Sequence, residues 1–517
     1  MTAEPIELIA TQPATLDSID RALDGGFTAQ RLDAWESDHI LLDTFDRLLR
    51  SEGWTLAHQY GRLALSDRRM IIPVASGPPS GSPSGPLFGR DLPAGDLRQR
   101  VADAIDVRAL LPLGRLHIRT EAYRITDDLQ KTVVRVNVLV PQLISRGGSA
   151  TPLSTRLRIQ EVRGYQDERD EVIAALSPAL GLGDADQTLP DEAILACGER
   201  PEGFSTKVAV PLDAGDPTGI AVSRVMRALL EVIEANLPGT LADTDSEFLH
   251  DYRVSIRRTR AVQRQFKHVF DPEELKRARA EFKWLQQSTG DARDLDVYVL
   301  GFDAMRELLP EEIRPDLEPV LTVLGRRRMV AHSAMGRALR SERARETFEA
   351  WERILGVLDH GPDADRPYSR RPIGEYTSRR IRKVYRRMLD MGRAIDAESP
   401  PEEFHDLRKK GKELRYLLEL FGQPLHDSSV VKPMIKTLKS LQDVLGHHQD
   451  REVQIAMLRS LADEVAVLPG GARALMAMGM LTCRLEEDAA DTRGRFGKVF
   501  EEFAAKDQRR LVKDTFS

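Results

Sequence analysis

Two stretches of this sequence share one arrangement of histidine and basic residues: "HDYRVSIRRTR" at 250–260 and "HDLRKKGKELR" at 405–415. In each stretch, basic side chains follow the histidine at spacings of three, seven and ten residues. At about 100° per residue, these positions lie on one side of an α-helix. Apolar residues stand one position before several of them, as Leu249, Tyr252 and Ile256 do in the first stretch. Each stretch therefore predicts an amphipathic helix with basic side chains along the edge of its buried face.

We call these two sets of side chains the first and the second basic row. The first basic row is His250, Arg253, Arg257 and Arg260, and the second basic row is His405, Arg408, Lys412 and Arg415.

The two rows belong to a longer internal repeat. His250 and His405 are 155 residues apart, and so are "SRVMR" at Ser223 and "SRRIR" at Ser378. Gly290 in "WLQQSTGDARDLDV" and Gly446 in "SLQDVLGHHQDREV" are 156 residues apart. Three landmarks at nearly one offset predict two copies of a unit of some four helices, related by a pseudo-twofold axis.

The 517 residues divide into two parts of different texture. The first part contains short alternating or β-branched segments such as "KTVVRVNVLV", which predict strands, and a Pro- and Gly-rich stretch at 76–89, which predicts a loop. The second part contains long amphipathic segments, which predict helices. The fold class is therefore α+β multidomain. The expected boundaries are a β-rich domain at 1–205, a linker at 206–219 and an all-α domain at 220–517, with repeats at about 220–365 and 372–517.

Composition limits the classes of function. The net charge is −6 with 30% charged residues, so attraction for polyanions has to come from local clusters. The two cysteines, Cys197 and Cys483, are far apart in the sequence, which indicates a reducing compartment. The N-terminus has no basic segment followed by an apolar one, and no run reaches membrane-spanning length. We therefore expect a soluble cytoplasmic protein that does not bind membranes.

The basic rows allow two interpretations. A row of basic residues on a helix is usually a solvated face whose charge is balanced by acids three or four positions away. These rows contain no acid, and Asp251 is the only acid within residues 250–270. Their self-repulsion favours a bound anion in a groove between the two repeats. Pairing with Asp291, Asp294 and Asp296 remains the alternative.

The histidines at the head of each row are the other chemical feature. Such a histidine could bind a metal, transfer a proton or donate a hydrogen bond to an anionic oxygen. Neither row supplies a second metal ligand, and the pair His447 and His448 has no counterpart in the first repeat, which reads "TGDARD". This half contains no nucleophile elbow, Gly-rich phosphate loop or zincin motif. We therefore predict a binding surface without catalytic residues or metal.

At these residues the chain resembles the CHAD family, the conserved-histidine α-helical domain, over about residues 215–517. The resemblance rests on the twin basic rows and on the twin "LQ" and glycine segments that follow them. It implies two helical bundles with an internal twofold, a basic central groove and binding of inorganic polyphosphate through both rows. It also implies contacts from Lys283 and Lys439, and from Arg224, Arg227, Arg379 and Arg382.

The N-terminal part resembles the CYTH family, which has a β-barrel-like triphosphate tunnel. The resemblance rests on "ILLDTFDRLLRSEGWTL" at 40–56 and "EVRGYQDERDEVIAAL" at 161–176. Catalytic members begin with Glu-x-Glu-x-Lys, whereas here Glu7 is followed by Ile9 and no lysine. Without two metal-binding carboxylates, the charge of a phosphoryl-transfer transition state is not neutralised. We interpret the tunnel as degenerate and non-catalytic, with a reduced anion site left at Arg115, Arg119, Arg124 and Arg135.

Three functions follow from these patterns. The first is a polyphosphate-binding protein without cofactor, acting as a scaffold that associates with polyphosphate granules. The second is a Mg²⁺- or Mn²⁺-dependent triphosphatase or polyphosphatase with a substrate-binding helical domain. The third is nucleic-acid binding, which an aromatic content of 6% disfavours because few rings are free to stack on bases.

Overall fold

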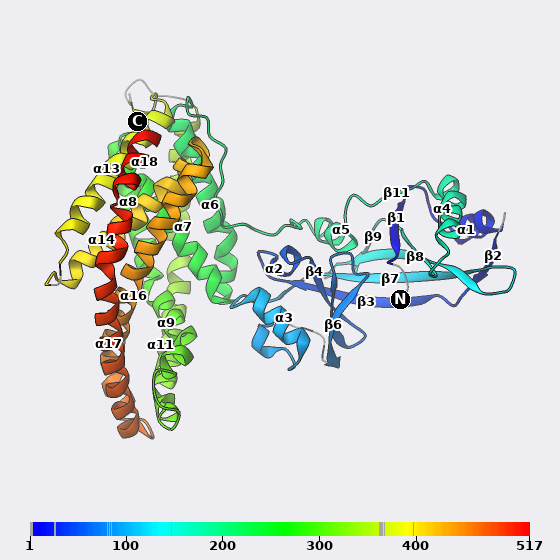
Figure 1. Cartoon of the computed structure of the whole chain (residues 1–517), viewed down its shortest axis with the longest axis horizontal. Coiled ribbons are helices and arrows are strands. Elements are labelled where there is room, and N and C mark those ends of the chain that lie inside the picture. The colour runs from blue at the N-terminus through cyan, green and yellow to red at the C-terminus, as the bar shows by residue number, and fades with distance from the viewer. Residues whose placement is uncertain are drawn as a thin grey trace. The chain divides into compact units, whose positions relative to one another are not determined.

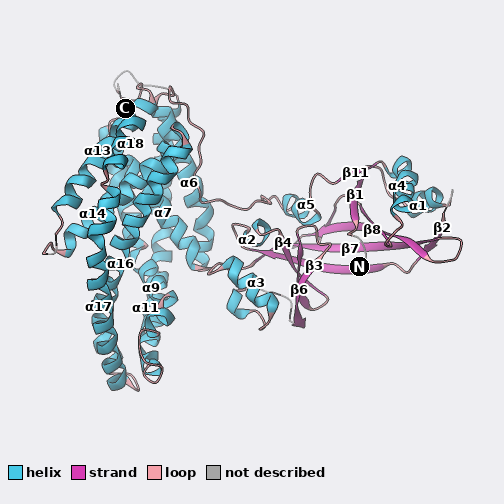
Figure 2. Ribbon diagram, viewed as in Figure 1, coloured by secondary structure: helices cyan, strands magenta, loops and turns pink. Residues whose placement is uncertain are grey.

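The structure is a computed structural model that describes residues 4–24, 27–79, 81, 83, 85–145, 147–360, 366, 368–396 and 398–516 (Figures 1 and 2). The chain divides into two compact units, Met1–Ser205 and Thr206–Ser517. Figure 2 shows that the strands lie in the first unit and that the second unit is helical. The predicted α+β organisation, with a β-rich N-terminal part and a helical C-terminal part, is confirmed.

The N-terminal unit is one antiparallel sheet with the strand order β11-β1-β10-β8-β7-β3-β4-β5-β6, in which β2 also pairs with β7 and β9 with β8. The strands are β1 (Ile6–Ala10), β2 (Thr28–Arg31), β3 (Trp35–Asp43), β4 (Trp54–Gln59), β5 (Arg62–Asp67), β6 (Pro73–Pro79), β7 (Leu111–Thr126), β8 (Thr132–Ile144), β9 (Ala150–Pro152), β10 (Arg156–Glu161) and β11 (Leu182–Asp184).

The expectation of a closed tunnel or barrel is wrong for this sheet. Within the described residues, the end strands β11 and β6 each pair with one neighbour, so the sheet is open. The short strand β11 and the prolines of β6, which lack an N–H donor, are typical of sheet edges. Residues 76–79, expected in a loop, continue β6, so proline there marks an edge strand.

Short helices cover the apolar faces of this sheet. They are α1 (Leu16–Leu23), α2 (Leu48–Ser51), α3 (Asp96–Ile105), α4 (Gln166–Leu180) and α5 (Leu189–Ala196), with a 3₁₀ turn at Gly89–Asp91. Helices α1 and α4 pack over β1, β8 and β10, where Ile19, Val136 and Leu176 are fully buried. Burial of these faces, rather than the propensity of such short segments, holds the helices in place.

The C-terminal unit consists of helices around one large apolar core, with a second cluster beside it. Figure 1 shows α16 and α17 extending together away from the main bundle, beside α9 and α11. The helices are α6 (Thr218–Ala242), α7 (Ser246–Gln265), α8 (Pro272–Ser288), α9 (Gly290–Leu300), α10 (Phe302–Arg306), α11 (Glu318–Leu339), α12 (Glu342–Asp359), α13 (Ile373–Ala394), α14 (Pro401–Leu417), α15 (Gln423–Leu425), α16 (Ser428–Ala466), α17 (Gly471–Phe503) and α18 (Lys506–Thr515), with a 3₁₀ turn at Arg314–Leu317 and a π-helical turn at Leu418–Gly422.

The two halves of this unit exchange backbone hydrogen bonds where α6 and α13 begin. The N–H of Thr218 donates to the carbonyl oxygen of Arg371 at 2.9 Å, and the N–H of Ile373 donates to that of Asp216 at 2.9 Å. The two bonds correspond at the offset of the internal repeat, with donor and acceptor segments interchanged. A second such pair joins Gly219 to Ser369 and Gly374 to Ala214. This is the pattern that a local twofold axis produces.

The segments that directly follow α7 and α14 also meet through equivalent side chains. Phe266 and Phe421 occupy corresponding positions of the two repeats, and their rings pack with centroids 4.7 Å apart. Both side chains are fully buried. This contact brings the two helices that carry the basic rows close to one another.

Candidate functional site

The apolar residues of α7 and α14 determine where the basic rows lie. The Asp245 side chain caps α7 by accepting the N–H groups of Glu247 and Phe248. Leu249, Tyr252 and Ile256 on α7 are buried in the core, as are Phe404, Leu407 and Leu414 on α14. Because each basic row runs one position behind these residues, both rows lie at the rim of the core rather than in open solvent.

Neutral groups hold the first row in position. The Nη1 atom of Arg253 donates to the carbonyl oxygen of Gln286 and to Oγ1 of Thr289, both at 2.7 Å. Nη1 of Arg260 donates to Oε1 of Gln286. Nε of Arg257 is buried and has no hydrogen-bond partner within the part of the chain that the structure describes. These contacts orient the guanidinium groups without cancelling their charge.

Burial and mutual repulsion act on the first row. Arg253 is only 8% exposed, and burial, followed by repulsion from Arg257, lowers its pKa to about 10. Asp294 opposes this shift, while burial raises the pKa of Asp294 itself. Asp296 instead contacts Arg328 at 2.6 Å and His332 at 2.9 Å. The anticipated acids therefore compensate the first row only from a distance.

The second row is arranged in the same way. Nη1 of Arg415 donates to Oε1 of Gln442 at 2.9 Å, and Gln442 is the counterpart of Gln286 in the second repeat. The nearest carboxylates are at 3.5 Å, Asp450 from Arg408 and Glu419 from Arg415. The row is thus only loosely neutralised.

Lys412 shows that the two rows face each other. Burial lowers the pKa of Lys412 to about 8, and repulsion from Arg408, Arg257 and Arg415 contributes to the shift. Arg257 belongs to the first row, whereas Arg408 and Arg415 belong to the second. Side chains from both repeats therefore create one positive potential around this ammonium group.

Arg257 and Arg260 of the first row and Lys412 of the second row line one cavity of about 580 Å³, which we call the central cavity. Lys409 and Lys410 in its lining contact Asp406 at 3.0 Å and Glu413 at 2.6 Å. No carboxylate within salt-bridge distance neutralises Arg257, Arg264 or Lys412 in the described chain. The lining consists of Arg257, Arg260, Arg264, Gln286, Arg387, Met391, Asp406, Lys409, Lys410, Lys412, Glu413 and Tyr416.

The two histidines join helices instead of lining this cavity. Nδ1 of His250 accepts a hydrogen bond from Nη2 of Arg293 at 2.9 Å. Nδ1 of His405 is 2.6 Å from Oε1 of Gln449, which is the counterpart of Arg293 in the second repeat. Arginine can only donate and a carbonyl oxygen can only accept, so Nδ1 accepts a hydrogen bond in His250 and donates one in His405. His250 therefore connects α7 to α9, and His405 connects α14 to α16.

Arg253, Arg408 and Arg415 of the two rows are not in the lining of the central cavity, and neither are the predicted site residues outside the rows. Arg224 pairs with Asp216 at 3.0 Å, Arg227 with Asp359 at 2.5 Å and Arg379 with Glu375 at 3.4 Å. Nε of Arg382 is buried without a partner in the described chain. Lys283 and Lys439 are exposed, and Lys283 lines a separate cavity between α7 and α8.

Several cations of the central cavity were missed by the sequence reasoning. Arg264 follows Arg260 by four residues, so continuing the spacing of the first row would have found it. Lys409 and Lys410 lie beside the second row, but their spacing does not place them on it. Arg387 comes from α13, and no pattern in the sequence connects it with α14.

The N-terminal sheet uses Glu7 in a buried ionic cluster. Glu7 accepts hydrogen bonds from Arg156 at 3.0 Å and Arg158 at 2.8 Å, and its side chain is 2% exposed. Arg156 is fully buried and also contacts Glu192 at 2.7 Å. The carboxylate that a catalytic tunnel would offer to a metal is thus already paired with two guanidinium groups. The described residues contain no group of three or more His, Cys, Asp or Glu side chains that could hold a metal ion.

The predicted N-terminal arginines do not form one site. Strand alternation places Arg115 and Arg119 on one face of β7, where they pair with Asp38 at 3.2 Å and Glu121 at 2.7 Å. Arg124 and Arg135 lie opposite each other on the other face.

A cavity of about 390 Å³ lies on the same face as Arg124 and Arg135, but its lining does not include them. Its charged or titratable lining residues include Arg158 and His39, and burial followed by Arg158 lowers the pKa of His39 to about 4. The reduced anion site is therefore not assembled from the four arginines.

Comparison with known proteins identifies the helical part. Residues 224–459, which include both basic rows, match the family model of the CHAD domain. The chain contains a CHAD domain. The resemblance of the N-terminal sheet to the CYTH family stays a prediction. No helix of the described CHAD region or sheet region is both long and apolar enough to cross a membrane.

Several relatives resemble the chain. Two uncharacterized proteins from two strains of Mycobacterium tuberculosis are each 26% identical over 286 residues, covering 52% of this chain and 53% of theirs. The chain thus spans about half the length of these curated relatives. The crystal structure of the CHAD domain from the plant Ricinus communis is 21% identical, with a TM-score of 0.48, and covers 57% of this chain and 96% of that one. PptA from Streptomyces chartreusis is 20% identical, with a TM-score of 0.43, and covers 55% and 100%.

Proposed function

We propose that the CHAD domain binds inorganic polyphosphate in the central cavity. The observation that carries the proposal is the position of Lys412, whose pKa is lowered to about 8 by burial and by Arg408, Arg257 and Arg415 together. Cations from two repeats are forced together without matching carboxylates. An anion that enters relieves this repulsion and releases its own counterions, and a chain with a charge on every phosphate does so repeatedly.

The arginines give the binding its geometry. A planar guanidinium can donate two parallel hydrogen bonds to phosphate oxygens, whereas an ammonium acts as a point charge. Arg260 is held by Gln286, and Arg415 by Gln442, so their charged ends are oriented before a ligand arrives. Arg257 and Lys412 line the same cavity as Arg260, and neither forms a salt bridge within the described residues, so their donors are available to the phosphate chain.

Nucleic acid fits the cavity less well than polyphosphate. Tyr416 is the only aromatic residue in the lining, and it is 4% exposed. The guanidinium carbons of Arg258 and Arg415 lie 5.7 and 5.6 Å from its ring centroid. No open ring is left in this lining on which a base could stack, so recognition is limited to phosphate charge.

In this proposal, the helical unit consists of two bundles, at about 220–365 and 372–517, that are related by a pseudo-twofold axis between α7 and α14. The reciprocal hydrogen bonds of Thr218 and Ile373 support this axis. We infer that the N-terminal sheet is not catalytic, since Glu7 is committed to Arg156 and Arg158. The protein then acts as a scaffold that polyphosphate granules recruit.

A salt-dependent titration tests this function. Long-chain polyphosphate is titrated into the full chain and into the double variant Arg257→Met/Lys412→Met, at several salt concentrations. We expect the slope of log affinity against log salt to fall by about 2 in the variant, one for each lost cation. Arg135→Met, which removes an exposed charge from the sheet, is the matched control and keeps the slope. Equal affinity and slope in all three proteins would refute the proposed site.

Two further assays separate the alternative functions. Competition between polyphosphate and single-stranded DNA at equal charge concentration should favour polyphosphate; preference for DNA would support the nucleic-acid function. Phosphate release from tripolyphosphate with Mg²⁺ or Mn²⁺ should be absent, and metal-dependent release by the parent chain would support the enzyme.

A further inference from the structure

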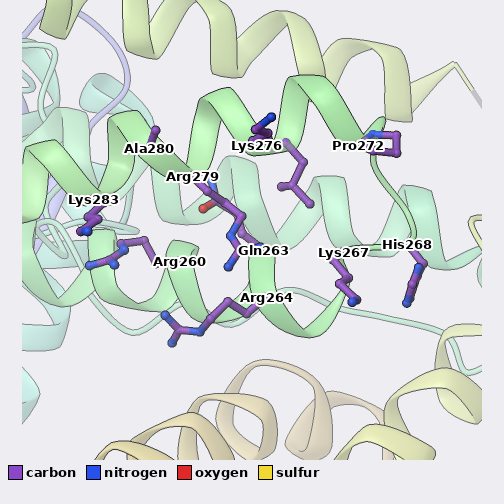
Figure 3. A pocket seen from close by; sticks show the side chains of 11 residues that line it. Arg260, Gln263, Arg264, Lys267, His268, Pro272, Lys276, Arg279, Ala280 and Lys283 are labelled. Carbon is purple, nitrogen blue, oxygen red and sulfur yellow. The ribbon is translucent and has the colours of Figure 1, made fainter.

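A second basic cavity, of about 590 Å³, lies between α7 and α8, and we call it the side cavity. Figure 3 shows Arg260 and Arg264 from one helix and Arg279 and Lys283 from the other around it. Lys267 and Lys276 add to the same lining, which contains no carboxylate, although Glu273 outside the lining lies 3.8 Å from Lys276. The side cavity is thus a second concentration of positive charge on the first repeat.

The side cavity continues from the central cavity. Arg260 and Arg264 line both of them. A phosphate chain that lies beside Arg257 and Lys412 therefore meets the further cations of the side cavity when it passes Arg264. A polyanion gains from each additional counterion that it releases, so a continuous cationic path favours longer chains.

The floor of the side cavity contains an unusual polar group. Gln263 is fully buried, and neither of its amide atoms has a hydrogen-bond partner within the described residues. Most buried polar atoms in proteins are hydrogen-bonded, so such an atom calls for an explanation. An amide N–H₂ beneath a rim of cations is a donor for an oxyanion.

The second repeat lacks this cavity's chemistry. The residues at the corresponding positions of the repeat are Leu418 for Gln263, Glu419 for Arg264 and Ile435 for Arg279. An amide and two cations are thus replaced by two apolar residues and an acid, while Lys436 stands at the position of Ala280. The second repeat therefore has a basic row of its own, but it lacks cations at the positions of Arg264 and Arg279.

Glu419 closes the path on the second repeat. Its carboxylate contacts Arg258 at 3.0 Å and Arg415 at 3.5 Å, so it neutralises the end of the second row. A phosphate chain moving in that direction would meet a negative charge instead of Arg264.

We propose that a condensed phosphate chain leaves the central cavity on one side only, through the side cavity along α7 and α8. This rests on the proposed function and adds to it a direction and a second subsite. Lys276 and Lys283 then contact long chains, whereas their counterparts in the second repeat, Lys432 and Lys439, do not.

The test compares two matched double variants, Lys276→Gln/Lys283→Gln and Lys432→Gln/Lys439→Gln. All four lysines are exposed, so both variants should fold like the parent, which thermal unfolding verifies. For long-chain polyphosphate, we expect the first variant to bind about tenfold more weakly with a salt slope smaller by about 2, and the second to bind unchanged. Tripolyphosphate, which fits within the central cavity, should bind equally to both.

The outcomes distinguish this path from the proposed function. Equal losses in the two variants, or a loss in neither, would overturn the one-sided path while leaving polyphosphate binding in the central cavity intact. Failure of the parent chain to bind polyphosphate of any length would overturn the proposed function and the path with it. Arg264→Glu, which installs the residue of the second repeat, should weaken the binding of short and long chains alike, because Arg264 lines both cavities.

Discussion

The N-terminal sheet and the CHAD domain both bury arginine, but they give it different partners. Arg156 in the sheet is fully buried between Glu7 at 3.0 Å and Glu192 at 2.7 Å. Arg253 in the CHAD domain is 8% exposed and contacts a carbonyl oxygen and a hydroxyl group. In the sheet the charge is cancelled, and in the helices it is oriented but retained. A buried arginine alone therefore does not form an anion site. Its charge is available to an anion only where no nearby carboxylate neutralises it.

Secondary structure accounts for part of this difference. In the antiparallel ladder, Glu7 and Arg158 stand directly opposite each other on β1 and β10, so opposite charges meet across neighbouring strands. On a helix, residues spaced by three, four and seven share one side, and a row of one sign repels itself. The packing of α7 against α14 then places two such rows together.

The largest effect should come from breaking the neutralised cluster. Glu7→Gln leaves the buried Arg156 and the partly buried Arg158 with too little negative charge, and removal of one partner of a buried ion pair costs about 3–5 kcal/mol. We expect this loss in the free energy of unfolding of the sheet, measured by denaturant titration, with unchanged polyphosphate binding. A loss below about 1 kcal/mol would mean that Glu192 alone compensates Arg156.

Charge reversal at the centre of the CHAD domain should have the next largest effect. Lys412→Glu places a negative charge between Arg257, Arg408 and Arg415, where it pairs with them internally and repels phosphate. We expect polyphosphate affinity to fall about 100-fold in a titration at low salt, because the site loses one charge and neutralises another. Arg135→Glu in the sheet should change the affinity less than about twofold. Similar losses of affinity in Lys412→Glu and Arg135→Glu would show that polyphosphate does not distinguish the CHAD domain from the sheet.

A smaller effect is expected for the buried arginine of the first row. Arg253→Met removes a desolvated charge together with its hydrogen bonds to Gln286 and Thr289. Since no carboxylate is left unpaired, the free energy of unfolding should fall by only about 1–2 kcal/mol. Unfolding monitored by circular dichroism measures it. A loss as large as that of Glu7→Gln would show that Arg253 is neutralised after all.

The pH dependence should show the smallest effect. The pKa of Lys412 is about 8 in the folded protein, below its ordinary value of 10.5, so polyphosphate affinity should fall about fivefold between pH 7 and 9 as the ammonium deprotonates. Lys412→Arg, which stays charged, should remove this dependence in the same titration.

The same shift makes a linked prediction for stability. Between about pH 8 and 10.5, the unfolded chain binds more protons at Lys412 than the folded chain does, so this residue makes the free energy of unfolding rise with pH. The rise should be absent in Lys412→Met. A fall with pH that depends on Lys412 would contradict the lowered pKa.

The extent to which the sequence predicted the site differs from residue to residue. The spacing of Arg253, Arg257 and Arg260 correctly places them along one edge of α7, because helix geometry is local. The neutral partners of Arg253 were not predictable, since Gln286 and Thr289 join α7 only through the packing of α8. The prediction of a closed tunnel was wrong, because closure depends on whether two edge strands that are distant in the sequence pair with each other.

By itself, the sequence determined the duplicated helical pattern, the like-charged rows and the strand-rich N-terminal part, because each follows from residue periodicity along a local segment. Only the tertiary structure decided that Lys412 lies near Arg257, that Glu7 pairs with two arginines and that a basic cavity forms between α7 and α8. Electrostatic partners are set by distance in space, and side chains far apart in the chain come within reach only when the helices and strands have packed.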